Sequence, residues 1–376
     1  RACSHFLHCL NKGYPTGAME MKSQREIHRV SPACVIPDLA GEITAALVGT
    51  GPALGLGEVR STSAPSKIAL VIGTSGTTGM SKEVAFTASA LLASARASNK
   101  FLGAKAGQQW SLFLPLTHIA AVNVIIRSME LGTLPIDLRE HQGEYPKVDF
   151  TSIVPTQLFR ALNSDERLLR HLQSAQAVLV GGAALSPALS QQAVTAGINV
   201  VETYGMTETS GGCIYNGKAI EGVEYSLNDK SLVQIRGSVM SETYLNAPEL
   251  YTLIDGWFIT NDLGEIKDGK LHILGRADDV IISGGENLSL TAIEATLSIR
   301  YPEIEFAAFA VNDIQWGHAL HLAVVGQIGE SEIDQYLEAA LGAASKPKGI
   351  HHLEQLPLLG IGKVDRSALA KMVGNE

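Results

Sequence analysis

The chain has 376 residues, of which 45 % are hydrophobic and 18 % charged, and its formal net charge is −9. This length and apolar content predict one large and one smaller globular domain, and exclude a disordered chain. No basic stripe and no apolar run of ~20 residues occurs, so we expect neither a nucleic-acid partner nor insertion into a membrane.

The four cysteines have neither the Cys-x-x-Cys spacing of a zinc site nor the density of a disulfide framework. A reduced, cytoplasmic protein is therefore expected. Residues 1–20 match no globular pattern, and we interpret them as an appended or mis-started segment. Met19 and Met21 are the alternative first residues.

Apolar β-rich runs alternate with helical patterns through the first two thirds of the chain. Strands are predicted over residues 68–72, 84–86, 111–114, 150–154 and 178–180, and helices over 87–102 and 119–131. The first of these helices should end at Gly103. Such alternation is typical of an α/β architecture.

Short strands joined by turns replace this pattern after about residue 230. They are predicted over residues 232–235, 257–260, 271–274, 305–311 and 321–325, with a helix over 331–341 capped by Ser331 and closed by Gly342. We therefore predict a large N-terminal α/β domain over residues 21–277 that includes a β-rich subdomain. A small, mobile α+β domain should follow over residues 278–376.

The segment from Gly73 to Lys82 has the composition of a phosphate-binding loop. Glycines let backbone N–H groups close around an anion, hydroxyl side chains add donors, and a lysine adds positive charge. The candidate residues are Thr74, Ser75, Gly76, Thr77, Thr78, Gly79 and Lys82. The Walker A motif, which needs adjacent Gly-Lys and a following helix, is absent. A strand over residues 84–86 follows instead, so we expect the loop to close a β-hairpin. An ordinary hairpin loop is the alternative interpretation.

This segment resembles the phosphate loop T-S-G-T-T-G-x-P-K-G of the adenylate-forming superfamily, which includes acyl-CoA synthetases, adenylation domains and luciferases. Ser81 replaces the usual proline and Glu83 the usual final glycine. Both differences lie at the exit of the loop. The resemblance covers about residues 65–376, and further motifs follow in the family's order.

The sequence Tyr204-Gly205-Met206-Thr207-Glu208 is similar to the family motif Y-G-x-T-E. The resemblance implies that Tyr204 stacks on adenine, Gly205 and Met206 border the substrate, Thr207 contacts the α-phosphate and Glu208 binds Mg²⁺. A flat aromatic ring, a hydroxyl and a carboxylate suit these three partners. A second segment, Gly181-Gly182-Ala183, resembles the loop on the other face of adenine.

Three later motifs resemble the rest of the family pattern. Asp262, in a W-x-x-T-G-D-like segment with Asn261 for glycine, and Arg276 would bind the ribose. The resemblance further implies that Asp278 is the pivot of the small domain and that Gly284 and Gly285 line the CoA tunnel. Lys363, in an L-P-x-x-x-x-G-K-x-x-R segment, would be the catalytic lysine.

His118, in a P-L-x-H motif, would lie between the acyl pocket and the CoA tunnel. The region before the phosphate loop is short, as in the o-succinylbenzoate–CoA ligases of menaquinone biosynthesis. Segments such as 154–158 and 203–213 also resemble those enzymes. That acid carries a second carboxylate, which needs a cation. Arg127 is the first candidate and Arg160 the second, because a guanidinium can bind a carboxylate bidentately.

The resemblance implies that ATP and coenzyme A are substrates and that Mg²⁺ is the metal. The acid would be converted first to an acyl-adenylate and then to a thioester. Three alternatives stay open: a ligase for another acid, a stand-alone adenylation domain that loads a carrier protein, and a non-catalytic binding module. Whether the chain forms a homodimer is also open.

Overall fold

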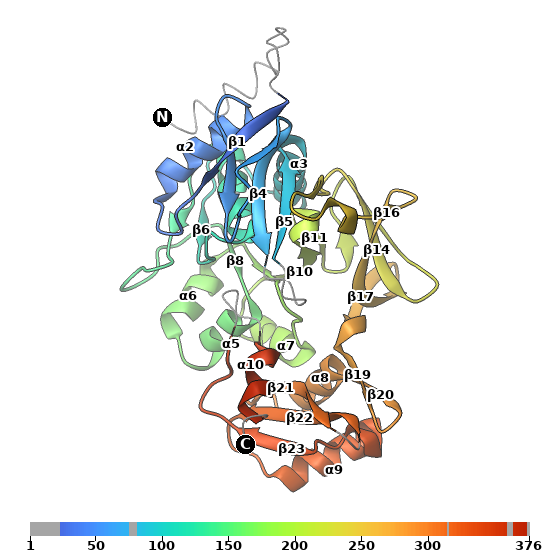
Figure 1. Ribbon diagram of the computed structural model, residues 1–376. Helices are drawn as coiled ribbons and strands as arrows, with labels where there is room; N and C mark the ends of the chain where they lie inside the picture. Colours follow the sequence, from blue (N-terminus) through green and yellow to red (C-terminus); the bar gives the residue numbers. More distant parts are fainter. Residues whose placement is uncertain (1–22, 75–80, 314–315, 359–363, 374–376) are drawn as a thin grey trace.

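The computed structural model of the chain describes residues 23–74, 81–313, 316–358 and 364–373. These residues form four β-sheets with helices packed against them (Figure 1). The predicted α/β class with a β-rich region is confirmed, because mixed sheets come first and antiparallel β-structure follows. No helix in these ranges has the length and apolarity needed to span a membrane.

The first sheet holds the strands that frame the candidate phosphate loop. Its six strands run in the order β15-β5-β4-β2-β1-β3. Their bounds are Gln24–Arg29 (β1), Ala53–Leu56 (β2), Ser63–Pro65 (β3), Ile68–Thr74 (β4), Lys82–Thr87 (β5) and Thr243–Tyr244 (β15). Strands β4 and β5 pair antiparallel, with Thr74 opposite Lys82, so the predicted hairpin is confirmed.

The second sheet has seven strands in the order β12-β11-β10-β9-β8-β6-β7. Their bounds are Trp110–Leu112 (β6), Ile136–Asp137 (β7), Phe150–Ile153 (β8), Ala177–Val180 (β9), Val200–Met206 (β10), Gly211–Tyr215 (β11) and Lys218–Ala219 (β12). Strands β6 to β10 are mutually parallel. Their carboxyl ends therefore meet at one edge, the place where open α/β sheets bind ligands.

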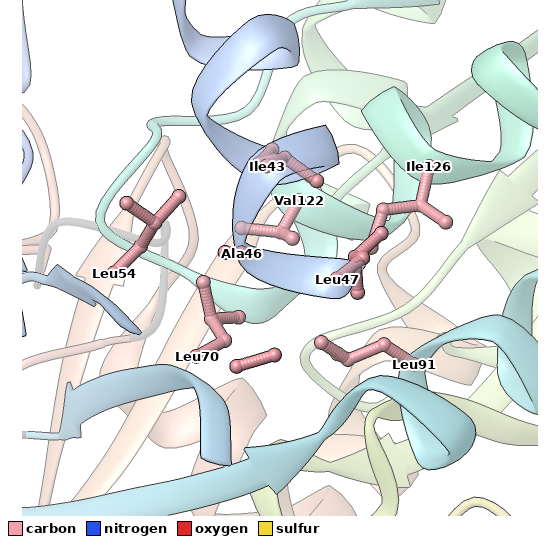
Figure 2. Close-up of a pocket in the computed structure, with 9 residues that line it drawn as sticks. Ile43, Ala46, Leu47, Leu54, Leu70, Leu91, Val122 and Ile126 are labelled. Carbon is pink, nitrogen blue, oxygen red and sulfur yellow. The ribbon is translucent and has the colours of Figure 1, made fainter. Parts of the chain in front are cut away.

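Helices α2 (Ile36–Leu47), α3 (Ala88–Phe101) and α4 (Ile119–Glu130) bury their apolar faces against these two sheets. Figure 2 shows part of this core, where only apolar side chains meet. They are Ile43, Ala46 and Leu47 of α2, Leu54 of β2, Ala69 and Leu70 of β4, Leu91 of α3, and Val122 and Ile126 of α4. Helix α3 starts as predicted, because the Thr87 hydroxyl accepts a hydrogen bond from the Ala90 amide.

Three shorter helices flank the second sheet: α5 (Pro155–Asn163), α6 (Glu166–Ser174) and α7 (Pro187–Thr195). The third sheet is antiparallel, in the order β13-β14-β17-β16 with β18 paired to β17. Its strands are Val223–Leu227 (β13), Leu232–Gly237 (β14), Leu253–Ile254 (β16), Trp257–Lys267 (β17) and Lys270–Arg276 (β18). This sheet is the predicted β-rich region.

The fourth sheet has the order β20-β19-β22-β21, with β23 paired to β22. Its strands are Val280–Ser283 (β19), Glu286–Ser289 (β20), Glu305–Asp313 (β21), Gly317–Val325 (β22) and Gly349–His352 (β23). Helices α8 (Leu290–Arg300), α9 (Glu330–Leu341) and α10 (Arg366–Val373) accompany it at the bottom of Figure 1. Two hydrophobic clusters there contain only residues after 280.

The predicted cap of the helix over residues 331–341 was wrong. Helix α9 starts at Glu330, its N-cap is Gly329, and Ser331 lies within the first turn. The Gly329 carbonyl accepts hydrogen bonds from the amides of Glu332 and Ile333. The negative charges of Glu330 and Glu332 interact favourably with the positive N-terminal end of the helix dipole. The helix therefore begins there without a side-chain cap.

Candidate active site

Thr74 and Lys82, at the facing ends of β4 and β5, are the described edges of the candidate phosphate loop. The Thr74 hydroxyl donates a hydrogen bond of 3.2 Å to the Lys82 carbonyl. The other predicted loop residues, Ser75, Gly76, Thr77, Thr78 and Gly79, lie outside the described residues. The structure thus fixes the stem of the loop.

Glu83, which replaces the family's glycine, is buried beside this stem, with 1 % of its surface exposed. Its Oε1 accepts hydrogen bonds from the backbone amides of Arg60 and Ser61 at 2.5 and 3.1 Å. The Glu83 amide in turn donates to the side-chain oxygen of Asn246. The carboxylate therefore ties the segment after β2 to the loop exit, a role that the motif comparison did not suggest.

Tyr204, Asp262 and Arg276 come together although they belong to separate motifs. The Tyr204 hydroxyl donates to Asp262 Oδ2 at 2.7 Å, across 58 residues of sequence. Asp262 pairs with Arg276 in the β17–β18 register, and their side chains are 3.6 Å apart. Burial and the neighbouring Asp262 carboxylate raise the pKa of Tyr204, so its phenol stays a neutral donor.

Gly181, Gly182 and Ala183 follow β9 at the carboxyl edge of the second sheet, next to the end of β10. A Cβ on Gly181 would lie 2.2 Å from Thr203 Oγ1 and 2.9 Å from the Thr203 carbonyl oxygen. Gly182 and Ala183 are exposed. The loop and Tyr204, which were predicted to hold the two faces of adenine, thus start from neighbouring strands.

Gly181→Ala should lower the stability of the protein by about 1–3 kcal/mol, because the added methyl overlaps Thr203 and the loop must shift. The same shift should weaken ATP binding. Thermal denaturation and ATP titration measure the two effects. Gly41→Ala is the matched control, since Gly41 lies within α2 and its Cβ would have no neighbour within 4 Å. Equal behaviour of the two variants would contradict the prediction.

Glu208 lies in a short 3-10 turn, Thr207–Thr209, directly after β10. Its backbone carbonyl accepts from the Ser241 amide at 2.7 Å. Its Oε1 accepts from the Tyr244 hydroxyl at 2.6 Å, and the Lys82 ammonium lies 4.7 Å from the centre of the Tyr244 ring. The phosphate-loop lysine and the predicted metal ligand thus contact the same tyrosine.

Gly205 and Met206 end β10 beside β11. A Cβ on Gly205 would lie 2.2 Å from the Gly211 carbonyl oxygen, so only glycine fits. The Met206 amide donates to the Thr209 hydroxyl at 2.9 Å. His118 is half-buried and is the residue that precedes helix α4. These residues lie at or after strand ends of the first two sheets.

Arg127, the first candidate for binding the second carboxylate of the acid, is buried in the core. It is 4 % exposed, its guanidinium donates to the Tyr215 hydroxyl at 3.0 Å, and it lies 5.4 Å from the centre of the Trp110 ring. The side chain of Arg160 on α5, by contrast, is 52 % exposed and 3.6 Å from Asp165.

The C-terminal motif residues lie around the fourth sheet. Gly284 and Gly285 form the turn between β19 and β20 with φ of 59° and 88°, a conformation that glycine adopts without strain. A Cβ on Gly284 would meet the Trp316 ring at 2.7 Å. Asp278 lies in the 3-10 turn Ala277–Asp279 that joins β18 to β19. Lys363 lies outside the described residues.

An ion-pair network that the sequence did not indicate lies beside the Ala277–Asp279 turn. Arg366, the last residue of the lysine motif, bonds both carboxylate oxygens of Glu294 at 2.8 and 3.0 Å and lies 3.8 Å from Asp279. Its Nε also donates to the Ala308 carbonyl. The network joins the helix that follows the lysine segment to the residue after Asp278.

Comparisons with known proteins define the class and then the family. Residues 17–242 match the family described as AMP-binding enzyme. The "Probable 2-succinylbenzoate--CoA ligase" of Mycobacterium tuberculosis H37Rv is 36 % identical over 333 residues, 82 % of this chain and 85 % of the relative. The 2-succinylbenzoate--CoA ligase of Lactococcus lactis is 29 % identical over 329 residues, 81 % of this chain and 71 % of the relative.

Among solved structures, wild-type E. coli MenE with a bound phenylether-linked analogue of OSB-AMS is similar to this chain. The TM-score is 0.65 and the identity 26 %, and the match covers 92 % of this chain and 82 % of that one. The fold is therefore that of the adenylate-forming enzymes. The chain belongs to the family of AMP-binding enzymes.

Proposed function

We propose that the protein is an ATP-dependent o-succinylbenzoate–CoA ligase. The observation that carries this proposal is that Tyr204, Asp262 and Arg276 form one contact network, while Glu208 follows Tyr204 in the chain and shares Tyr244 with Lys82. Tyr204 offers an aromatic ring for the base, and Asp262 offers a hydrogen-bond acceptor for the ribose hydroxyls. Glu208 offers a carboxylate for the metal, and Lys82 offers an ammonium for the phosphates. The names of the relatives supply the acid.

In the first half-reaction, a carboxylate oxygen of the acid attacks the α-phosphorus of ATP. A new O–P bond forms, the bond to the bridging oxygen breaks, and pyrophosphate leaves. Catalysis of such a step rests mainly on positioning and electrostatics. Tyr204 and the loop from Gly181 would hold adenine, Asp262 and Arg276 the ribose, and Lys82 with the loop from Thr74 to Gly79 the phosphates.

Glu208 suits a magnesium ion bound to the nucleotide. The residue lies directly after β10, at the carboxyl edge of the second sheet. Mg²⁺ is commonly bound by one or two carboxylate oxygens together with phosphate oxygens and waters. In the described ranges no group of three or more His, Cys, Asp and Glu could hold a metal by itself. When bound, Mg²⁺ would neutralise charge on the phosphates, and Thr207 would contact the α-phosphate.

In the second half-reaction, the CoA thiolate attacks the acyl carbon, the C–S bond forms, and AMP leaves with its oxygen. We propose that residues 278–376 form a domain that turns about Asp278 between the two steps. Lys363 would serve the first step and the Gly284–Gly285 turn the second. His118 would border the path between the acyl group and CoA.

Arg160 is the cation that we propose for the second carboxylate of the acid. Helix α5 begins at the carboxyl edge of the parallel strands, and the Arg160 side chain is half-exposed with a carboxylate partner 3.6 Å away. A surface ion pair of this kind contributes little stability. Exchanging Asp165 for a substrate carboxylate would therefore cost little, whereas Arg127 is enclosed in the core.

Pyrophosphate exchange tests the function. With ATP, Mg²⁺ and a panel of aromatic and aliphatic acids, o-succinylbenzoate should give the fastest exchange of label into ATP, and CoA should then yield the thioester. Fastest exchange with another acid would assign a different ligase, and an adenylate that CoA cannot discharge would indicate a carrier-loading domain. No exchange with any acid would indicate a binding module.

A cytoplasmic location, also a proposal, rests on the cysteine pattern.

A further inference from the structure

Tyr244 contacts both Lys82 and Glu208, the charged residues proposed to bind the phosphates and their metal. Its side chain is 2 % exposed, and its hydroxyl donates to Glu208 Oε1 at 2.6 Å. The Lys82 ammonium is 4.7 Å from the centre of its ring. Within the part of the chain that the structure describes, Lys82 and Glu208 share this tyrosine and form no ion pair with each other.

Tyr244 is itself held rigidly. It belongs to the edge strand β15, which pairs with β5, the strand that starts at Lys82. The Tyr251 ring packs edge-on against it at 5.2 Å, and the Tyr251 hydroxyl donates to the Ser241 carbonyl. The Ser241 amide donates to the Glu208 backbone carbonyl, and the Tyr244 hydroxyl donates to the Glu208 carboxylate. Residues 241–244 therefore bind both the main chain and the side chain of Glu208.

In this arrangement one uncharged side chain contacts both an ammonium and a carboxylate. A neutral phenol orients the carboxylate through one oxygen, as groups around a metal ligand commonly do. The ring face attracts the ammonium only weakly.

We propose that Tyr244 is a positioning residue that aims the Glu208 carboxylate at the metal and holds the Lys82 ammonium beside it. This inference rests on the proposed function, since it takes Glu208 as the magnesium ligand. Tyr244 lies 36 residues from Glu208 along the chain and outside the motifs described above, so the sequence did not indicate this contact.

Tyr244→Phe keeps the ring and removes the hydroxyl. We expect the Kd of Mn²⁺ for the complex with α,β-methylene-ATP, measured by electron paramagnetic resonance, to rise about 10-fold or more, as for other lost partners of metal ligands. The Mg²⁺ midpoint of pyrophosphate exchange should shift equally, while metal-free nucleotide binding should not change. Tyr244→Leu, which also removes the ring under Lys82, should in addition weaken binding of metal-free nucleotide.

Tyr225→Phe is the matched control, since it removes a phenol hydroxyl that donates to the backbone carbonyls of Gly217 and Gly269 rather than to Glu208. Its thermal midpoint should fall as that of Tyr244→Phe does, with the Mn²⁺ Kd unchanged. In a Glu208→Gln background, Tyr244→Phe should add no further shift, because the two act through one contact. Equal Mn²⁺ shifts in both tyrosine variants, or a full extra shift in that background, would overturn the inference.

Failure of the inference can be told apart from failure of the proposed function. If Glu208→Gln leaves Mn²⁺ binding unchanged, the metal lies elsewhere and the proposed role of Glu208 falls. If Glu208→Gln weakens Mn²⁺ binding and Tyr244→Phe does not, the metal site stands and the positioning role of Tyr244 is wrong.

Discussion

Lys363→Ala should slow formation of the acyl-adenylate from ATP by about 10²–10³-fold or more. Removing one preorganised donor from a developing oxyanion has a cost of this size, and a full positive charge adds to it. Pyrophosphate exchange measures the step directly. The same variant should still convert preformed acyl-adenylate and CoA to the thioester at a near-normal rate, because the proposed rotation about Asp278 withdraws Lys363 before that step.

Gly285→Leu should show the opposite pattern. It should spare pyrophosphate exchange and block thioester formation, because its side chain would fill the proposed CoA tunnel. A Cβ on Gly285 meets no atom within 4 Å, although the φ of 88° adds backbone strain, so circular dichroism must show that the variant is folded.

If folded Lys363→Ala lost both half-reactions equally, the two-conformation mechanism would be wrong for this protein.

o-Succinylbenzoate should support pyrophosphate exchange on the order of 10⁴-fold better, in kcat/KM, than benzoylpropionate, the analogue without the ring carboxylate. A site built to pair with a charged group leaves that group unpaired when the analogue binds, and this penalty gives strong discrimination. Initial rates over a range of acid concentrations measure the ratio. Equal exchange with both acids would refute the assignment to o-succinylbenzoate.

The arginine that meets the ring carboxylate can be identified with the same assay. Arg160→Ala should reduce the preference for o-succinylbenzoate and leave the rate with benzoylpropionate unchanged. Arg127→Met is the contrasting variant: it should change stability, because the buried guanidinium bonds Tyr215 and packs on Trp110, and should keep the preference. Loss of the preference in Arg127→Met alone would restore Arg127 as the ligand.

Local patterns in the sequence were sufficient to predict much of the fold. Alternation of apolar runs with helical periodicity gave α3 and α4 to within about one residue, because each has a continuous apolar face and a clear end. The hairpin β4–β5 was also predicted, since strand residues flank a run of Gly, Ser and Thr. The first residue of α9 was predicted wrongly, because a glycine followed by acidic residues gives no side-chain cap to recognise.

The motifs likewise named the candidate nucleotide residues from sequence alone, because each motif is a short run of residue types suited to one part of ATP. Long-range contacts were beyond such reasoning. Ten of the twelve residues of α4 are buried, so the helix encloses Arg127 whatever its charge suggests. The contacts of Tyr244 with Glu208 and of Arg366 with Glu294 join residues 36 and 72 positions apart. The sequence by itself determined which chemical groups the protein carries, and only the tertiary structure decided which of them meet, because strand order and packing, not spacing along the chain, set those distances.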